Sequence, residues 1–125
     1  QARDDLVTST RALLDKTLAQ YHLDALIRAT EDMVFRVDIV KGDNDGPGAS
    51  FLPAVSGYPH LTVPMGYVRD LPVGLSFIGP AWSDARLLAL GAAFERAAGA
   101  RKPPGFLPSL ETKPEFAAAL APLPR

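Results

Sequence analysis

The sequence contains no cysteine. That absence excludes disulfides, thiolate zinc sites and a cysteine nucleophile, although it does not identify a compartment. Neither sign of charge is in excess, since 13 Lys and Arg are balanced by 14 Asp and Glu. No apolar run approaches the roughly 20 residues that a transmembrane helix needs. We therefore expect neither a nucleic-acid partner nor a membrane partner. For the compartment, which these features leave open, our expectation is the cytoplasm.

The first residue is Gln rather than Met, and the opening QARDD is too polar for a signal peptide. We expect a processed form, a natural fragment or an engineered piece. The chain has 125 residues, of which 47% are hydrophobic and 22% are charged. This composition suits one globular domain or a part of a larger one.

Two segments have the apolar spacing of helices. Residues 3–21 form an amphipathic pattern through Leu6, Leu13, Leu14, Leu18 and Tyr21. The clearer helix lies between Ser83, a suitable N-cap, and Gly99, a suitable C-cap. Its expected apolar face consists of Leu87, Leu90, Phe94 and Ala98, with Leu88 beside it. A shorter helix is expected near residues 49–56, closed by a left-handed Gly57.

Strands are expected at residues 23–29, 61–65 and 73–78, and residues 33–40 suit either a strand or an irregular segment. In the last strand Gly74 and Ser76 share one face, which predicts close packing there. Pro59 and Pro72 are expected just before strands, where a missing N–H costs least. Pro64 falls inside its strand and predicts an edge, an irregularity or a gap in the ladder. Gly66 and Gly74 are expected to allow turns and tight contact between helix and sheet.

The residues that usually carry chemistry have simpler explanations here. DNDG at 43–46 fails as a calcium loop, because the flanking ligand positions would fall on Lys41 and Leu52. The two histidines, His22 and His60, do not form a metal-ligand spacing. Ser56 lacks the motif of a nucleophile elbow and is expected to be a small residue in a turn. The four lysines lie in polar contexts that do not favour a neutral base.

The composition changes after residue 102. Six of the twelve prolines lie in residues 103–125, so we expect an extended tail with one helical turn at residues 116–120. The chain therefore divides into a folded part, residues 1–102, and a Pro-rich tail, residues 103–125.

Residues 54–101 resemble the C-terminal part of the amidase signature family. The resemblance is carried by Gly57-Tyr58-Pro59, Val63-Pro64-Met65-Gly66, Leu71-Pro72-Val73-Gly74-Leu75, Ile78-Gly79, Leu87-Leu88 and Phe94-Glu95. Their order and spacing follow the family pattern, and together they are specific. The resemblance implies an α/β fold, in which a mixed β-sheet with packed helices is the C-terminal part of an α/β/α sandwich.

The chemistry implied by this resemblance is acyl transfer through a serine that is activated by a second serine and a lysine. That set lies in a Gly/Ser-rich signature that this sequence does not contain, so no residue here inherits a catalytic role. The resemblance implies no cofactor and no metal. It makes Ser50 and Phe51 candidates for the wall of the substrate pocket. In the glutaminyl-tRNA amidotransferase branch an acidic residue contacts the substrate, and its position would align near Pro47. A proline there argues against that substrate and leaves peptide amides and aryl acylamides open.

Two functions are consistent with these observations. The chain is expected to be the C-terminal fragment of an amidase, inactive alone and partnered by the missing N-terminal part. The alternative is a non-catalytic module derived from the same fold, which would act in interaction or oligomerisation through self-association.

Overall fold

The structure of the protein is a computed structural model that describes residues 1–35, 38–42, 46, 48–106, 109 and 113–116. Helices and strands follow one another along this part of the chain, which confirms the expected α/β class. The elements are α1 (Ala2–Gln20), β1 (Leu26–Ala29), α2 (Phe51–Ser56), β2 (His60–Val68), β3 (Leu71–Ile78), α3 (Asp84–Ala98) and the 3-10 turn η2 (Pro114–Phe116).

The three strands form one sheet in the order β1-β3-β2, so β3 is central. Both pairings are antiparallel, and the part of the expected mixed sheet that is described here contains no parallel pair. β2 and β3 form a hairpin whose turn residues, Arg69 and Asp70, both have positive φ, at 50° and 64°. That conformation matches the twist of the strands. The predicted pairing of residues 61–65 with 73–78 is therefore confirmed.

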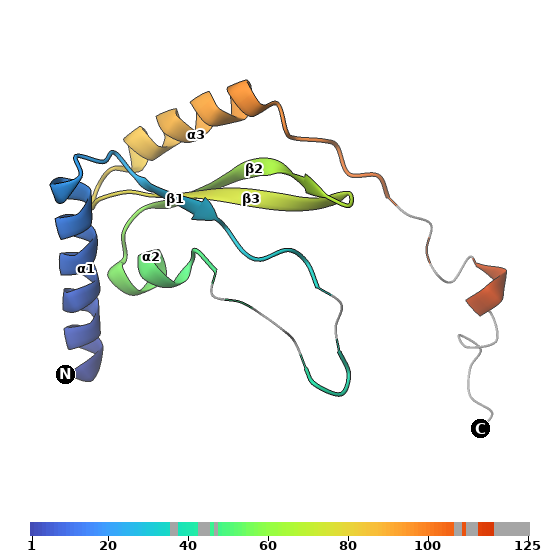
Figure 1. The fold of residues 1–125 in the computed structure, drawn as a ribbon, viewed down its shortest axis with the longest axis horizontal. Coiled ribbons are helices and arrows are strands. Elements are labelled where there is room, and N and C mark those ends of the chain that lie inside the picture. The colour runs from blue at the N-terminus through green and yellow to red at the C-terminus, as the bar shows by residue number, and fades with distance from the viewer. Residues whose placement is uncertain (36–37, 43–45, 47, 107–108, 110–112, 117–125) are drawn as a thin grey trace.

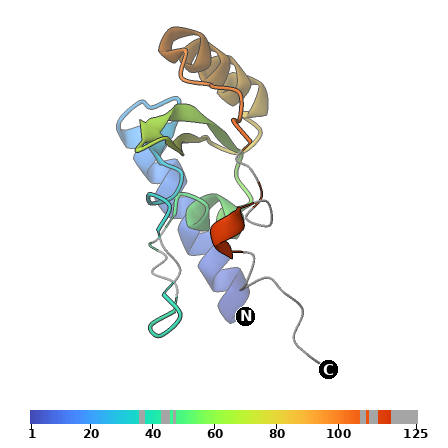
Figure 2. The same cartoon turned by 90° about the vertical axis from the view of Figure 1, so that its right-hand side faces the viewer.

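The elements are arranged in layers. Figure 1 shows α3 along one face of the sheet and α2 beneath the other, while α1 extends from one end of the sheet. The perpendicular view in Figure 2 shows the same order of layers. α3 contacts mainly β2 and to a smaller extent β3, and α1 packs against α2.

The core lies between the sheet and α3. It contains Val63, Leu75, Phe77 and Leu87, with Leu61, Leu90 and Phe94 packed around them. Leu87 is 2% exposed and its neighbour Leu88 is 60% exposed. The predicted helix face is confirmed at Leu87, Leu90 and Phe94, whereas Ala98, near the end of the helix, is exposed. Burying one such side chain contributes about 1.5–3 kcal/mol.

Glycine at the contact between helix and sheet is Gly91 rather than the predicted Gly74. A Cβ at Gly91 would lie 2.4 Å from Leu61 Cδ2, so any larger residue there would force the Leu61 side chain or α3 to move. Gly74 faces the opposite side, where a Cβ would lie 2.7 Å from Thr30 Oγ1. The expected close packing at Gly74 is therefore present, but between strands rather than against a helix.

The prolines mark the strand ends and one irregularity. Pro59 precedes β2 as expected. Of the three alternatives given for Pro64, two are found: β2 is an outer strand of the sheet, and its register shifts between Pro64 and Gly66. Pro72 does not precede a strand as expected, because it lies inside β3 opposite Tyr67. It is tolerated there because β1 extends only to the residue opposite Leu75, which leaves that end of β3 with one neighbouring strand.

Two other expectations need correction. The predicted strand at residues 23–29 forms only from Leu26, which pairs with Ile78 at the end of β3, so the preceding residues have no pairing partner in this sheet. Ser83 is the N-cap residue of α3, but its hydroxyl donates to Pro80 O at 2.8 Å instead of bonding to the helix. Gly57 and Gly99 do close α2 and α3 in the left-handed conformation, as predicted.

α1 is only partly covered. Leu14 and Leu18 are buried, whereas Leu6, Leu13 and Tyr21 are 48%, 56% and 62% exposed. α1 packs mainly on the six-residue α2, and such a short neighbour buries a narrow stripe. The wider predicted apolar face therefore remains in contact with solvent.

The long connection between β1 and α2 has little regular structure where it is described. Residues 33–35 form no strand, and Asp38 makes an isolated bridge with Gly42. The Asp38 carboxylate accepts hydrogen bonds from the backbone of Lys41 and Val40, which lowers its pKa. Residues 43–45 of the DNDG stretch and Pro47 lie outside the described residues, as does most of the predicted turn at 116–120.

Candidate functional site

The sheet face that points away from α3 carries a group of hydroxyls, which we call the hydroxyl cluster (Thr30, Thr62 and Ser76). Ser76 Oγ donates to Thr30 Oγ1 at 2.9 Å, and Thr30 Oγ1 donates to Thr62 Oγ1 at 3.4 Å. Thr62 Oγ1 lies 3.3 Å from Ser76 Oγ. The cluster therefore joins β2, β3 and the residue after β1 by side-chain bonds in addition to the backbone ladder.

His60 completes this group, because its Nε2 lies 2.7 Å from Ser76 Oγ. A serine bonded to a histidine is the arrangement of an activated nucleophile, which needs the imidazole to accept the serine proton. Here Ser76 Oγ donates its single proton to Thr30 Oγ1, and a hydroxyl that donates there has no second proton to give to His60. Ser76 is also 0% exposed and out of reach of a substrate. The pair is a structural hydrogen bond between neighbouring strands.

A cleft of about 400 Å³, the sheet cleft, opens beside the hydroxyl cluster. Its polar wall includes Glu31 and Asp32 from the segment after β1. Ser50 donates from Oγ to Glu31 Oε1 at 3.3 Å, and the backbone N–H of Ala49 donates to Thr30 O at 2.7 Å. The remaining lining residues are Thr30, Val34, Thr62, Val63, Pro64, Pro72, Val73 and Gly74.

The two residues expected to face substrate lie at the start of α2. Ser50 is its N-cap residue and is exposed, and Phe51, the first helical residue, is 61% exposed. Neither lines the sheet cleft directly, but the bond from Ser50 to Glu31 connects them to its rim. Their assignment to a substrate pocket stays a prediction.

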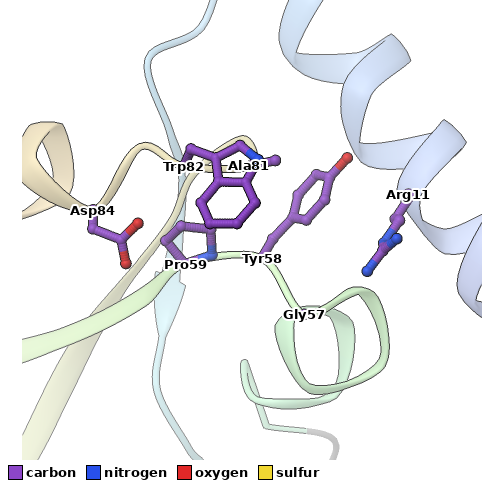
Figure 3. Close-up of a pocket in the computed structure, with 7 residues that line it drawn as sticks. All are labelled: Arg11, Gly57, Tyr58, Pro59, Ala81, Trp82 and Asp84. Carbon is purple, nitrogen blue, oxygen red and sulfur yellow. The ribbon is translucent and has the colours of Figure 1, made fainter.

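A second cleft, the Trp82 cleft, has a volume of about 470 Å³ and is lined by residues of α1, of the connection after α2 and of the connection into α3. Figure 3 shows the Tyr58 side chain extending from the connection after α2 toward α1. Trp82, in the connection from β3 to α3, is 96% exposed and has a φ of 64°, which is uncommon for a large side chain. The other lining residues are Arg11, Gly57, Pro59, Ala81 and Asp84.

Two side chains of the Trp82 cleft also hold α1 in place. Arg11 Nε donates to Ser56 O at 2.7 Å, and Tyr58 OH donates to the Asp15 carboxylate at 2.7 and 2.8 Å. The hydrogen bond to Asp15 raises the pKa of Tyr58, because the charged phenolate could not donate it. Both contacts connect residues more than 40 positions apart, so local sequence gave no signal for them.

The described residues do not assemble an obvious catalytic centre. Ser56, expected to be a turn residue, is 0% exposed and its Oγ accepts the Tyr58 N–H at 3.2 Å. Lys16, Lys41, Lys102 and Lys113 are all exposed. No cluster of three or more His, Asp or Glu suitable for a metal occurs in the described ranges, nor does any helix there have the length and apolarity to span a bilayer.

No protein-family model matches this chain. Individual known proteins do match it, over most of its length. A peptide amidase from Stenotrophomonas maltophilia superposes with a TM-score of 0.66 and 40% sequence identity, over 80% of this chain and 21% of that one. A protein of Arabidopsis thaliana named as a probable amidase is 32% identical over 95 residues, which are 75% of this chain and 15% of the relative.

The chain belongs to the amidase signature family. The A subunit of the Streptococcus pyogenes glutamyl-tRNA(Gln) amidotransferase is 34% identical over 88 residues, which are 65% of this chain and 17% of that subunit. This amidase-family chain thus spans about a fifth or less of the relatives it matches. The resemblance predicted from the motifs between residues 54 and 101 is confirmed, as is the expected fragment-sized coverage.

Proposed function

We propose that this chain is the C-terminal part of an amidase-signature hydrolase whose nucleophilic serine and base lie in polypeptide beyond these 125 residues. The complete enzyme would cleave a carboxamide C–N bond through an acyl-serine intermediate, and this part would support the sheet and wall the substrate pocket. The match of 80% of this chain to 21% of a peptide amidase carries the proposal. The buried Ser56 and Ser76 and the exposed lysines support the absence of a catalytic centre within the chain.

The direct test is an amidase assay on the purified 125-residue chain. Peptides with C-terminal amides and aryl acylamides are incubated with the chain, and released ammonia or arylamine is measured. We expect no turnover above the buffer rate. Turnover by this polypeptide alone, retained through repeated purification and unaffected by any added chain, would overturn the proposal.

Ser50 and Phe51 are the residues we propose for the substrate wall. In the complete enzyme, Phe51→Ala should raise KM for amide substrates more than it lowers kcat, because a wall residue contributes binding rather than chemistry. Leu88→Ala is a matched control, since Leu88 is similarly exposed at 60% but lies on the opposite side of the sheet. Equal effects of the two substitutions would remove Phe51 from the wall.

We also propose residues 1–102 as the folded unit and residues 103–125 as its tail. Lys102 lies at this boundary and contacts the sheet: its backbone N–H donates to Tyr67 OH at 3.0 Å, and its ammonium lies 4.6 Å from the Tyr67 ring centroid. A chain ending at Lys102 should therefore unfold at the same urea concentration as the full chain. A markedly lower midpoint would place part of the tail in the fold.

The alternative function, a non-catalytic interaction module, is favoured by one observation. Several large apolar side chains are more than half exposed, including Ile27, Val34, Ile39 and Phe106. Light scattering separates the alternatives. Stable self-association at micromolar concentration supports a module that oligomerises, and a soluble monomer counts against it.

A further inference from the structure

The segment that leads into α2 is fixed to the centre of the sheet. The backbone N–H of Ala49 donates to Thr30 O at 2.7 Å, and Ala49 is 2% exposed. Thr30 is itself tied to β3, because its N–H donates to Gly74 O at 2.8 Å and its hydroxyl accepts from Ser76 Oγ at 2.9 Å. The backbone is therefore held in place one residue before Ser50, the N-cap residue of α2.

Glu31, the residue after Thr30, holds the next part of the same segment. Its Oε1 accepts a hydrogen bond from the Ser50 hydroxyl at 3.3 Å. A Cβ placed at Gly48 would collide with both oxygens of the Glu31 carboxylate, so this carboxylate lies directly against Gly48. Glycine at position 48 thus leaves the space through which Glu31 reaches Ser50. We call these three residues the Glu31 clamp (Glu31, Gly48 and Ser50).

The other end of α2 is fixed by different contacts. Arg11 Nε donates to Ser56 O at 2.7 Å, and Gly57 ends the helix in the left-handed conformation. Because α2 has only six residues, its position depends on such tertiary contacts more than on helix propensity. The Glu31 clamp acts at the end of α2 where Phe51 lies.

We propose that Glu31 is a positioning residue, which through Ser50 holds Phe51 in the place that the substrate wall requires. This inference rests on the proposed function, because Ser50 and Phe51 wall a substrate pocket only in a complete amidase. Glu31 acts as a hydrogen-bond acceptor for Ser50 and supports substrate binding rather than the chemical step. Glu31 also lines the sheet cleft, so a direct contact between its charge and the substrate is the competing role.

Steady-state kinetics of the complete enzyme on amide substrates separate these roles. Glu31→Ala removes the acceptor and should raise KM about twofold to tenfold, the range expected for one lost hydrogen bond, while kcat changes by less than about twofold. Glu31→Gln keeps an oxygen that can accept from Ser50, so its KM should stay near that of the unchanged enzyme. If Glu31→Gln raises KM as much as Glu31→Ala does, the charge itself is required and the positioning role is wrong.

Gly48 provides a second test, because a methyl group added there displaces the Glu31 carboxylate without removing it. Gly48→Ala should raise KM as much as Glu31→Ala, and it should have no further effect in an enzyme that already carries Glu31→Ala. Gly105→Ala is the matched control and should leave KM unchanged, since a Cβ there has nothing within 4 Å. Additive effects of Gly48→Ala and Glu31→Ala would mean that the two residues act separately, which overturns the clamp.

Hydrogen exchange in the 125-residue chain distinguishes a wrong clamp from a wrong function. The backbone N–H groups of Ala49 and Ala54 are hydrogen-bonded at the start of α2, so their exchange reports how firmly this end is held. Glu31→Ala and Gly48→Ala should each speed that exchange about twofold to tenfold, and Glu31→Gln should not. Unchanged exchange in all three variants overturns the clamp. A complete protein without amidase activity instead refutes the proposed function, and with it the role of Glu31 in substrate binding, even where exchange responds as expected.

Discussion

Ser76→Ala is the substitution that best tests the hydroxyl cluster. Ser76 is 0% exposed, and its Oγ makes two short contacts, 2.7 Å to His60 Nε2 and 2.9 Å to Thr30 Oγ1. A typical hydrogen bond contributes roughly 1 kcal/mol net. The third contact, 3.3 Å to Thr62 Oγ1, is longer than a good O–H···O bond and is not counted. We expect the free energy of unfolding to fall by about 2 kcal/mol.

Urea unfolding followed by far-UV circular dichroism measures this change. Tryptophan fluorescence is a poor probe here, because Trp82 is already 96% exposed in the folded chain. Ser9→Ala is the matched control, since the Ser9 hydroxyl donates only to Leu6 O on an exposed helix surface. It should change stability by less than about 0.5 kcal/mol.

The reasoning also predicts that Ser76 and Thr30 act together. Because each loses the same bond, Ser76→Ala combined with Thr30→Val should cost less than the sum of the two single changes. If Ser76→Ala unfolds within about 0.5 kcal/mol of the unchanged chain with the same dependence on urea, the cluster does not stabilise the sheet.

Three further predictions concern packing, backbone and pH. Leu87→Ala should lower the free energy of unfolding by about 3 kcal/mol, and Leu88→Ala by less than about 0.5 kcal/mol, in the same urea assay, because only Leu87 is buried. Equal losses would contradict the packing of α3. Gly57→Ala should cost about 1 kcal/mol through its φ of +72°, and a neutral result would mean that α2 does not end in the left-handed conformation. The raised pKa of Tyr58 adds folding stability that is complete below about pH 10 and is lost as the pH rises through the folded pKa. Asp15→Asn removes the hydrogen bond that raises this pKa, so the free energy of unfolding should fall less over alkaline pH than in the unchanged chain. The same dependence of stability on pH in both proteins would contradict the bond.

Only some properties of the candidate site residues could be predicted from the sequence. The exclusion of Ser56 as a nucleophile followed from the missing elbow motif, and the structure buries that residue. Ser50 and Phe51 were chosen by resemblance, and the structure places them at the exposed start of α2 without testing their role. His60 was considered only as a lone histidine, because its partner Ser76 lies 16 positions away on another strand.

Sequence by itself determined the elements whose causes are local. The apolar spacing of α3, the left-handed glycines at Gly57 and Gly99 and the irregularity at Pro64 all depend on a residue and its neighbours within about one turn. Each of these was predicted at its correct position.

Tertiary structure alone decided which segments meet. The placement of β3 between β1 and β2, the hydroxyl cluster and the anchoring of α1 through Arg11 and Tyr58 join residues separated by 14 to 46 positions. Such contacts follow from strand register and from the face on which each helix packs. The early end of β1 has the same origin, since a strand extends only as far as its neighbour offers hydrogen bonds.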